Sequence, residues 1–236
     1  MRRIAKGYRA RFCALLRTVR ARKLDQALAW LGAQAERIRS TEQVPAEVAL
    51  MRVVERVRRR LEPWQARLEA SSGANGSPGM PQFICDAGLG GLARWLRAAG
   101  YPAIWRPQWD DAALLEEARR TGATLLTTDS LLMERRLLRD GVIPALWLPP
   151  TLRPAGQLQQ VLRQLRLPLR PARCMSCGGA LRPADKQAVQ DRIPPRTYRW
   201  RDHYFECEDC GKLFWHGTHW ERIQQQLKTV VLTQGS

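Results

Sequence analysis

The stretch QFICDAGLGGLARWLRAAG, residues 82–100, decides the fold of this chain. Its first part, Gln82–Asp86, is short and apolar, ends in an acid and predicts a buried strand. Helical periodicity follows at once over Leu89–Ala99, and Gly100 marks the helix end. A strand that leads directly into a helix is the repeating unit of α/β proteins.

The same alternation continues downstream of residue 100. Further strands are predicted at Ala103–Arg106, Thr124–Thr127 and Ala145–Leu148, and further helices at Asp111–Thr121, at roughly 130–139 and at Gln157–Leu165. Units of this length form parallel sheets that are flanked by helices. The sequence therefore predicts an α/β domain over residues 80–170.

Acidic residues follow two of these strands. Asp86 and Asp129 lie at or just past predicted strand ends, and the pair Asp110-Asp111 opens a helix in the same layer. Each acid by itself is explained as a helix cap or a turn residue. Together they occupy the edge where parallel sheets bind ligands, and carboxylates are the ligands that magnesium and manganese prefer. We therefore predict a divalent metal site here.

Two Cys-x-x-Cys motifs hold four of the six cysteines. Cys174 and Cys177 form the first, Cys207 and Cys210 form the second, and a glycine follows each motif. Two such motifs, 29 residues apart, predict a tetrahedral four-cysteine zinc site of the zinc-ribbon type. Disulfides are the alternative, but nothing else in the chain is typical of a secreted protein. Because four thiolates fill the coordination sphere, this zinc is expected to be structural.

The chain is strongly basic. Among 236 residues, 39 Lys and Arg face 22 Asp and Glu, so the net charge is +17. Such a charge favours polyphosphate partners, and a solubilising surface is the alternative. No apolar run is long enough to span a bilayer, and the N-terminus lacks a secretory apolar segment. Cys13 and Cys85 lie outside the two motifs and, with a thiolate zinc site in the same chain, fit a reducing, cytoplasmic location.

Residues 1–79 lack the alternation of strands and helices that is predicted downstream. Residues 1–70 have helical periodicity and an excess of ten basic over acidic residues, and they predict a basic helical extension. The segment 71–79, SSGANGSPG, predicts a flexible linker. We expect the extension to act as a tethered second binding module. Within it, Arg58, Arg59 and Arg60 form either a solvated face or a phosphate-binding group.

Four stretches together resemble the Mut-seven C-terminal ribonuclease family, a PIN-like nuclease domain fused to a zinc ribbon. They are DAGLGGLARWLRAAG (86–100), LLTTD (125–129), RCMSC (173–177) and CEDCGKLFWHGTHW (207–220). The resemblance covers about residues 82–225. It implies metal-dependent RNA cleavage at Asp86, Asp111 and Asp129, and its register favours Asp111 over Asp110. Thr128 and Pro102 depart from the family pattern, which has arginine and aspartate there.

Other residues are candidates for contacts with RNA. Arg94 and Arg97 lie three residues apart on the first helix after Asp86, so we expect them to share a face and to clamp the scissile phosphate or the acids; surface charge is the alternative. His219 and Trp220 follow the second cysteine motif and are candidates for stacking on bases, with a core role as the alternative for both. Zinc ligation by His219 is the least favoured reading, because four cysteines are already present.

The sequence thus predicts a PIN-like parallel sheet over residues 80–170, a zinc ribbon over 171–225, a tail over 226–236 and a basic all-helical extension in front. The expected function is that of a magnesium- or manganese-dependent ribonuclease, an endonuclease, with ribosome association as a further expectation. One alternative is a non-catalytic RNA- or ribosome-binding module with a vestigial site. A zinc-ribbon DNA-binding regulator ranks last, because no base-reading helix motif is present.

Overall fold

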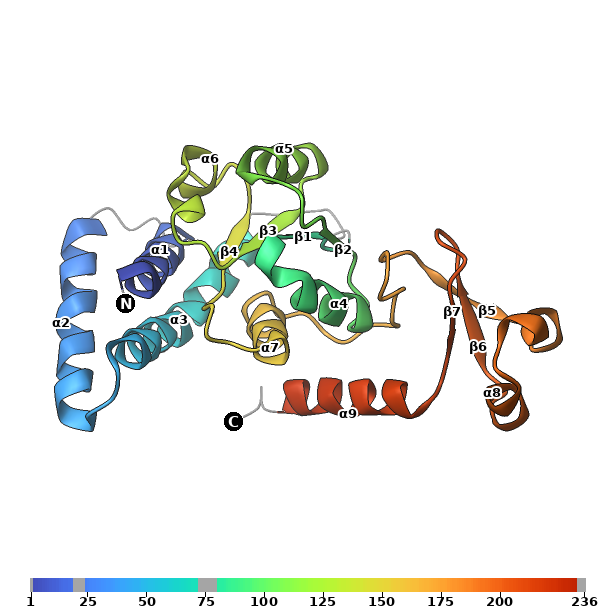
Figure 1. The fold of residues 1–236 in the computed structure, drawn as a ribbon. Coiled ribbons are helices and arrows are strands. Elements are labelled where there is room, and N and C mark those ends of the chain that lie inside the picture. Colours follow the sequence, from blue (N-terminus) through green and yellow to red (C-terminus); the bar gives the residue numbers. More distant parts are fainter. Residues whose placement is uncertain (1, 19–23, 72–79, 233–236) are drawn as a thin grey trace. The chain divides into compact units, whose positions relative to one another are not determined.

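The central element of the fold is a four-stranded sheet, seen in a computed structural model that describes residues 2–18, 24–71 and 80–232 (Figure 1). Its strands are β1 (Phe83–Cys85), β2 (Ala103–Trp105), β3 (Thr124–Thr127) and β4 (Ala145–Trp147), in the order β2-β1-β3-β4. The pairs β1/β2 and β3/β4 are parallel. The predicted α/β class with a parallel sheet is confirmed.

Helices α4 (Gly90–Ala98), α5 (Asp111–Thr121) and α7 (Pro154–Gln164) alternate with these strands, as predicted. Two details differ from the prediction. The helix expected over 130–139 is broken into a 3₁₀ turn, Leu132–Glu134, and the short α6, Arg136–Arg139. Helix α7 begins earlier than expected because Pro154, whose fixed φ suits the first turn of a helix, opens it.

The C-terminal part carries the second sheet. Strands β5 (Leu181–Ala184), β6 (Tyr204–Cys207) and β7 (Leu213–Trp215) pair antiparallel in that order. A 3₁₀ turn (Gln187–Arg192) and helix α8 (Pro195–Trp200) connect β5 to β6, and α9 (Thr218–Leu232) follows β7. Residues 226–232, expected to be a tail, therefore continue a helix.

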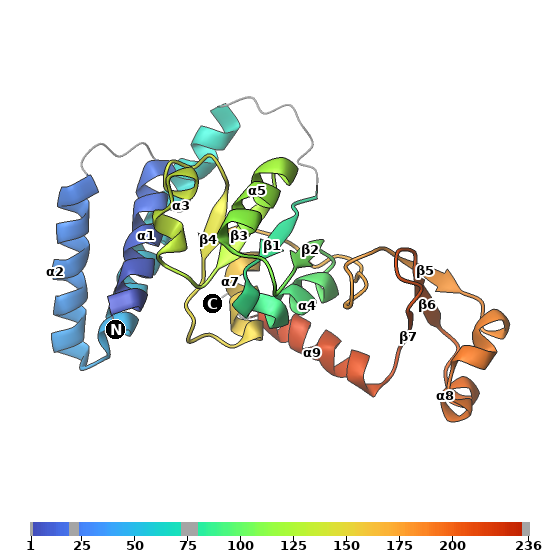
Figure 2. The same ribbon diagram turned by 45° about the horizontal axis from the view of Figure 1, so that its top comes forward.

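The N-terminal extension is helical, as predicted, and consists in its described part of α1 (Arg2–Thr18), α2 (Leu24–Glu42) and α3 (Ala46–Ser71) (Figure 2). Its core includes Phe12, Leu31 and Val53, each almost fully buried. Of the predicted linker, Ser71 ends α3 and residues 72–79 lie outside the described residues. Within the described ranges, no helix is both long and apolar enough to cross a membrane.

The chain divides into two compact units: Met1–Gly79 with Asp111–Pro150, and Met80–Asp110 with Thr151–Ser236. In the first unit, Tyr8 of α1 packs edge-on against the Trp147 ring of β4, with ring centres 5.1 Å apart. Both side chains are buried. Lys6 also pairs with Glu134 at 3.4 Å. The extension is therefore packed on a sheet strand, which corrects the expectation of an independent tethered module.

Candidate functional site

The four cysteines of the Cys-x-x-Cys motifs form one cluster, in which all four sulfurs lie within 4.8 Å of one another. The Sγ atoms of Cys174 and Cys210 are 3.7 Å apart, and those of Cys177 and Cys207 are 3.4 Å apart. In a tetrahedral site with metal–sulfur bonds of about 2.3 Å, two sulfurs are about 3.8 Å apart. The cluster therefore has the size that a tetrahedral metal ion requires.

Backbone groups prepare this cluster for a cation. The glycines after the two motifs, Gly178 and Gly211, have φ of +95° and +65°, so each motif closes with the left-handed residue that its turn requires. Burial raises the pKa of Cys174, but hydrogen bonds from the amides of Cys177 and Ser176 outweigh it, and the pKa falls to about 7. A thiolate, which is the metal-binding form, is thus favoured at Cys174, whereas burial raises the pKa of Cys177 to about 12.

Arg97 lies beside the first cysteine motif rather than in solvent. Its side chain is 5% exposed, and its Nη1 donates hydrogen bonds to the carbonyl oxygens of Met175 and Ser176 at 3.0 and 2.8 Å. Its Nε donates to the Ala103 carbonyl at 2.9 Å. This corrects the prediction of a phosphate clamp at Arg97, because the guanidinium is buried against backbone carbonyls. Arg94, one turn earlier, is exposed.

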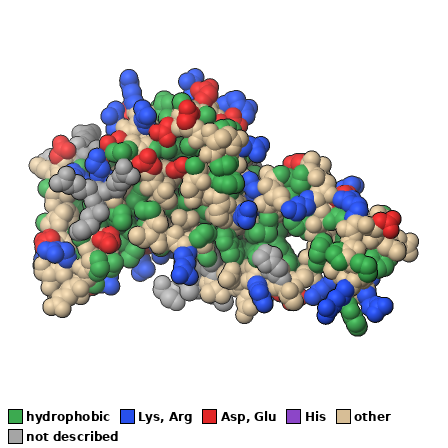
Figure 3. Space-filling view, in the orientation of Figure 1, with side chains coloured by type: hydrophobic (Ala, Val, Ile, Leu, Met, Phe, Trp, Pro, Cys, Tyr) green, Lys and Arg blue, Asp and Glu red, His purple; other side chains and the backbone are tan. Residues whose placement is uncertain are grey.

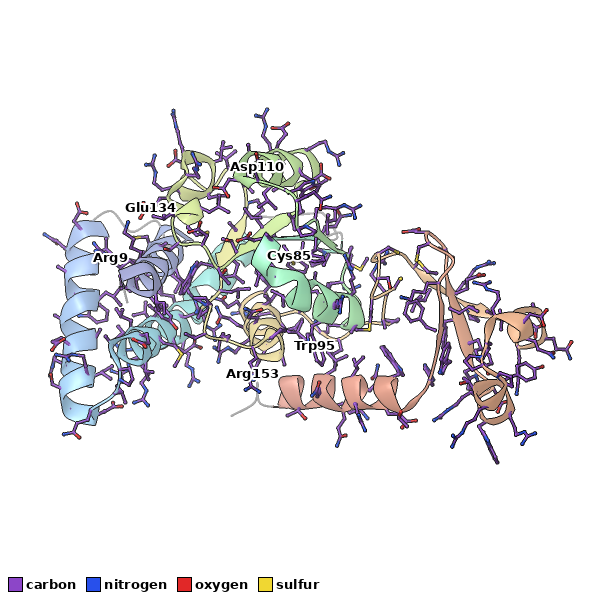
Figure 4. All side chains as sticks on the ribbon, in the orientation of Figure 1. Arg9, Cys85, Trp95, Asp110, Glu134 and Arg153 are labelled. Carbon is purple, nitrogen blue, oxygen red and sulfur yellow. The ribbon has the colours of Figure 1, made fainter. Side chains whose placement is uncertain are left out.

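Asp86 follows β1 directly and is half-buried. Its carbonyl oxygen accepts a hydrogen bond from the Leu89 amide at 2.8 Å, which starts the 3₁₀ turn Ala87–Leu89. The Trp105 indole Nε1 donates to the Ala87 carbonyl at 2.9 Å and fixes the same turn. The preceding Cys85 is fully buried in β1, which raises its pKa to about 12, so it stays a neutral thiol (Figure 4).

Asp129 lies just past β3 and is also half-buried. Its Oδ1 accepts the Leu131 amide at 2.7 Å, and its own amide donates to the Thr127 hydroxyl at 2.9 Å. The Trp147 indole Nε1 donates to the Thr128 carbonyl at 3.1 Å. Side-chain hydrogen bonds on both sides therefore hold the backbone that carries this carboxylate.

Asp111 is the first residue of α5, and Figure 4 labels its neighbour Asp110 at the same end of the helix. Asp111 Oδ2 lies 3.6 Å from Nη2 of Arg135, and both side chains are largely exposed. Sequence analysis did not single out Arg135, since it is one of several arginines between residues 134 and 140 and no spacing links it to Asp111. Asp111 and Asp129 belong to the first compact unit, and Asp86 belongs to the second.

The predicted RNA-contact residues have different environments. Arg58 is buried in the helical extension, and its Nη2 pairs with Glu55 Oε1 at 2.8 Å, so the structure contradicts its assignment as a phosphate contact. Arg59 and Arg60 are exposed. Trp220 is half-buried and stacks on the His216 ring, whereas the side chain of His219 lies outside the described residues.

Exposed cations are widely distributed on the face shown in Figure 3, and several of them gather over α8. In α8, Arg196 and Arg199 are exposed beside Trp200, which is 73% exposed. Two other cations of the same region share one carboxylate: Arg182 and Arg192 each pair with Glu206 at 2.7 Å. The large positive charge of the sequence is thus partly compensated in the ribbon.

A family model matches this chain. The model of the family described as the Mut7-C RNAse domain matches residues 81–227, which is most of the chain and includes Asp86, Asp111, Asp129 and all four clustered cysteines. No curated protein and no solved structure matches the chain. The resemblance that the sequence motifs indicated is confirmed. With its parallel sheet, its four-cysteine cluster and this match over residues 81–227, the chain belongs to the Mut7-C RNAse domain family.

Proposed function

We propose that this protein is a divalent-metal-dependent ribonuclease that cuts RNA phosphodiester bonds internally, and that it acts in the cytoplasm. Membership in a family described as an RNAse domain carries the proposal. The positions of the acids support it: Asp86 follows β1, Asp129 follows β3 and Asp111 opens α5. In parallel sheets the carboxyl ends of strands form the edge at which substrates bind.

In this proposal Asp86, Asp111 and Asp129 hold magnesium or manganese. Their oxygen donors are the ligand type that these ions prefer. Such an ion, when bound, activates water and stabilises the leaving oxygen of a phosphodiester. The Asx-type turn at Asp129 restricts the motion of its carboxylate, since Oδ1 accepts the Leu131 amide at 2.7 Å.

Two exposed arginines are suited to bind the phosphates of the substrate. Arg94 is exposed on α4, close in sequence to Asp86, and Arg135 lies 3.6 Å from Asp111. A guanidinium can donate two parallel hydrogen bonds to a phosphate. Arg135 would supply a positive charge beside the acids in a chain that has Thr128 where the family pattern has arginine.

The cysteine cluster would hold a structural zinc ion, because four sulfur ligands at tetrahedral spacing leave no position open for substrate. The ribbon would then orient the RNA. A non-catalytic RNA- or ribosome-binding module is the second candidate function, and Thr128 in place of the family arginine favours it.

The test is to incubate the zinc-loaded protein with a mixed RNA pool and with a circular single-stranded RNA, each with added manganese. Cleavage of the circle requires an endonuclease. Asp86→Asn serves as the matched control and should leave both substrates intact. A wild-type protein that binds RNA but releases no fragments in manganese or magnesium would favour the non-catalytic module.

A further inference from the structure

A pocket of about 260 Å³ opens on one face of the ribbon sheet. Its lining includes Arg173, Met175, Phe205, Phe214, His216 and Trp220, all in the second unit. Phe205 of β6 and Phe214 of β7 are paired in register, so they share one face of the sheet. The buried ribbon core of Val189, Ile193 and Tyr204 adjoins the pocket, because Trp215 packs against that core and also lines the pocket.

Three of the lining rings contact one another: the Phe205 and His216 rings are tilted by 35°, and the His216 and Trp220 rings are stacked. The His216 ring lies 5.1 Å from that of Phe205 and 6.1 Å from that of Trp220, with an interplanar angle of 7° to Trp220. His216 is exposed, and Phe205 and Trp220 are half-buried. All three side chains line the pocket. These faces are therefore accessible to a flat, apolar ligand.

A fixed cation lies at the same pocket. The Nε of Arg173 donates a hydrogen bond of 2.6 Å to the Gly178 carbonyl, which orients the guanidinium. Met175, between the first two clustered cysteines, is also part of the lining. Arg173 and Met175 flank Cys174 in the sequence. Metal binding by the cysteines would therefore order these two lining residues together with the ribbon.

We propose that this pocket binds one unpaired base of single-stranded RNA, stacked against Trp220 and His216, with Arg173 facing the adjoining phosphate. The inference deepens the proposed function and rests on it for the choice of RNA. A volume of about 260 Å³ is just below the roughly 300–1,000 Å³ typical of sites for drug-sized ligands, which suits a single base. Stacking of bases on aromatic rings tolerates any sequence, and the net charge of +17 favours a phosphate-bearing ligand.

Binding is measured without catalytic metal, so that the result does not depend on cleavage. The probe is a short, unstructured oligoribonucleotide that contains 2-aminopurine at one position, whose fluorescence falls when the base stacks. Wild-type protein should bind the probe and quench it. Trp220→Ala and His216→Ala should each weaken binding by roughly 5- to 100-fold, as expected for the loss of one stacked base.

Trp200→Ala is the matched control, because Trp200 is a ribbon tryptophan that is 73% exposed and does not line the pocket. It should change binding by less than about twofold. Metal content and melting temperature report whether each variant is folded. If Trp220→Ala loses its metal, His216→Ala decides the question, since shortening an exposed side chain removes little buried surface.

Wild-type affinity in both pocket variants, a larger loss in Trp200→Ala, or no binding of the probe by the wild type would each overturn the inference. Asp86→Asn should bind and quench the probe normally. Pocket-dependent binding together with absent cleavage would refute the ribonuclease proposal alone. Cleavage that depends on the acids, together with unchanged binding in the pocket variants, would refute the pocket alone.

Discussion

Nη1 of Arg97, in α4, donates a 3.0 Å hydrogen bond to the carbonyl oxygen of Met175, the residue after the first clustered cysteine. The α/β part of the second unit is thereby tied to the cysteine cluster through a buried cation. Burial lowers the pKa of Arg97 from its ordinary value, and the thiols of Cys85 and Cys177 oppose this effect. Four thiolates around one divalent ion carry a net charge of about −2, which would favour a neighbouring guanidinium.

The first prediction is that Arg97→Ala destabilises the ribbon. The change leaves the buried carbonyl of Ala103 and the partly buried carbonyl contacts of Met175 and Ser176 without their donor, so the free energy of unfolding should fall by about 3 kcal/mol. Metal should also be released to a chelator faster. Urea denaturation and a colorimetric zinc assay measure both effects. Arg94→Ala, on the exposed side of the same helix, should leave both unchanged; equal effects of the two variants would contradict this role.

The second prediction concerns the acids. Asp129→Asn keeps an oxygen that can accept the Leu131 amide, so its melting temperature should match that of the wild type. Cleavage should fall by about a hundredfold or more, because metal-centred catalysis supplies several kcal/mol. Asp86→Asn should behave alike, and activity retained in the double variant would rule out the metal site. Asp111→Asn should lower cleavage more than Asp110→Asn does. The reverse order would mean that Asp110, and not Asp111, belongs to the metal site.

The third prediction is that Cys207→Ser releases about one zinc ion per chain and unfolds the ribbon, since metal binding and folding of a small ribbon are one event. Cys13→Ser is the matched control, because Cys13 is half-buried in α1 and is not part of the cluster. It should keep its zinc. Elemental analysis of the purified proteins gives the answer directly, and a wild type without zinc would disprove the assignment.

The fourth prediction compares two helical glycines. A methyl group at Gly7 in α1 would overlap the indole of Trp147, whereas one at Gly32 in α2 would meet nothing within 4 Å. Gly32→Ala should therefore stabilise the protein by up to about 1 kcal/mol, as alanine does in helices.

Gly7→Ala should instead destabilise the protein and lower cleavage, because Trp147 holds the Thr128 carbonyl next to Asp129. Thermal melting and an RNA cleavage assay measure the two effects. Stabilisation by both substitutions would show that α1 does not pack on β4 in solution.

The fifth prediction is that Cys85 is inert despite its position beside Asp86. Its pKa is raised to about 12 by burial, so its contribution to stability is complete below pH of about 9 and is lost as the pH rises towards 12. At pH 8 iodoacetamide should leave Cys85 unmodified in the folded protein and alkylate it in urea. Mass spectrometry of the digested protein detects the difference, and rapid labelling of Cys85 without urea would refute the burial.

Much of the local structure was determined by the sequence itself. Thr124–Thr127 and Asp111–Thr121 have their predicted limits, because short apolar strands and capped amphipathic helices are specified by neighbouring residues. The cysteine motifs predicted a four-sulfur cluster, and the glycine after each motif has a positive φ, since the spacing of the ligands and the turn are both local properties. The motifs likewise indicated the family.

Only the tertiary structure decided what distant segments do to individual side chains. Arg94 and Arg97 are equivalent in the sequence pattern, yet only Arg97 is buried, because the first cysteine motif packs over that part of α4. Arg135 lies beside Asp111, and Tyr8 packs on Trp147. The two residues of each pair are well separated in the sequence, and hydrophobic periodicity does not predict contacts of this kind. Burial and partner choice depend on the segments that pack together, and these contacts arise only when the whole chain has folded.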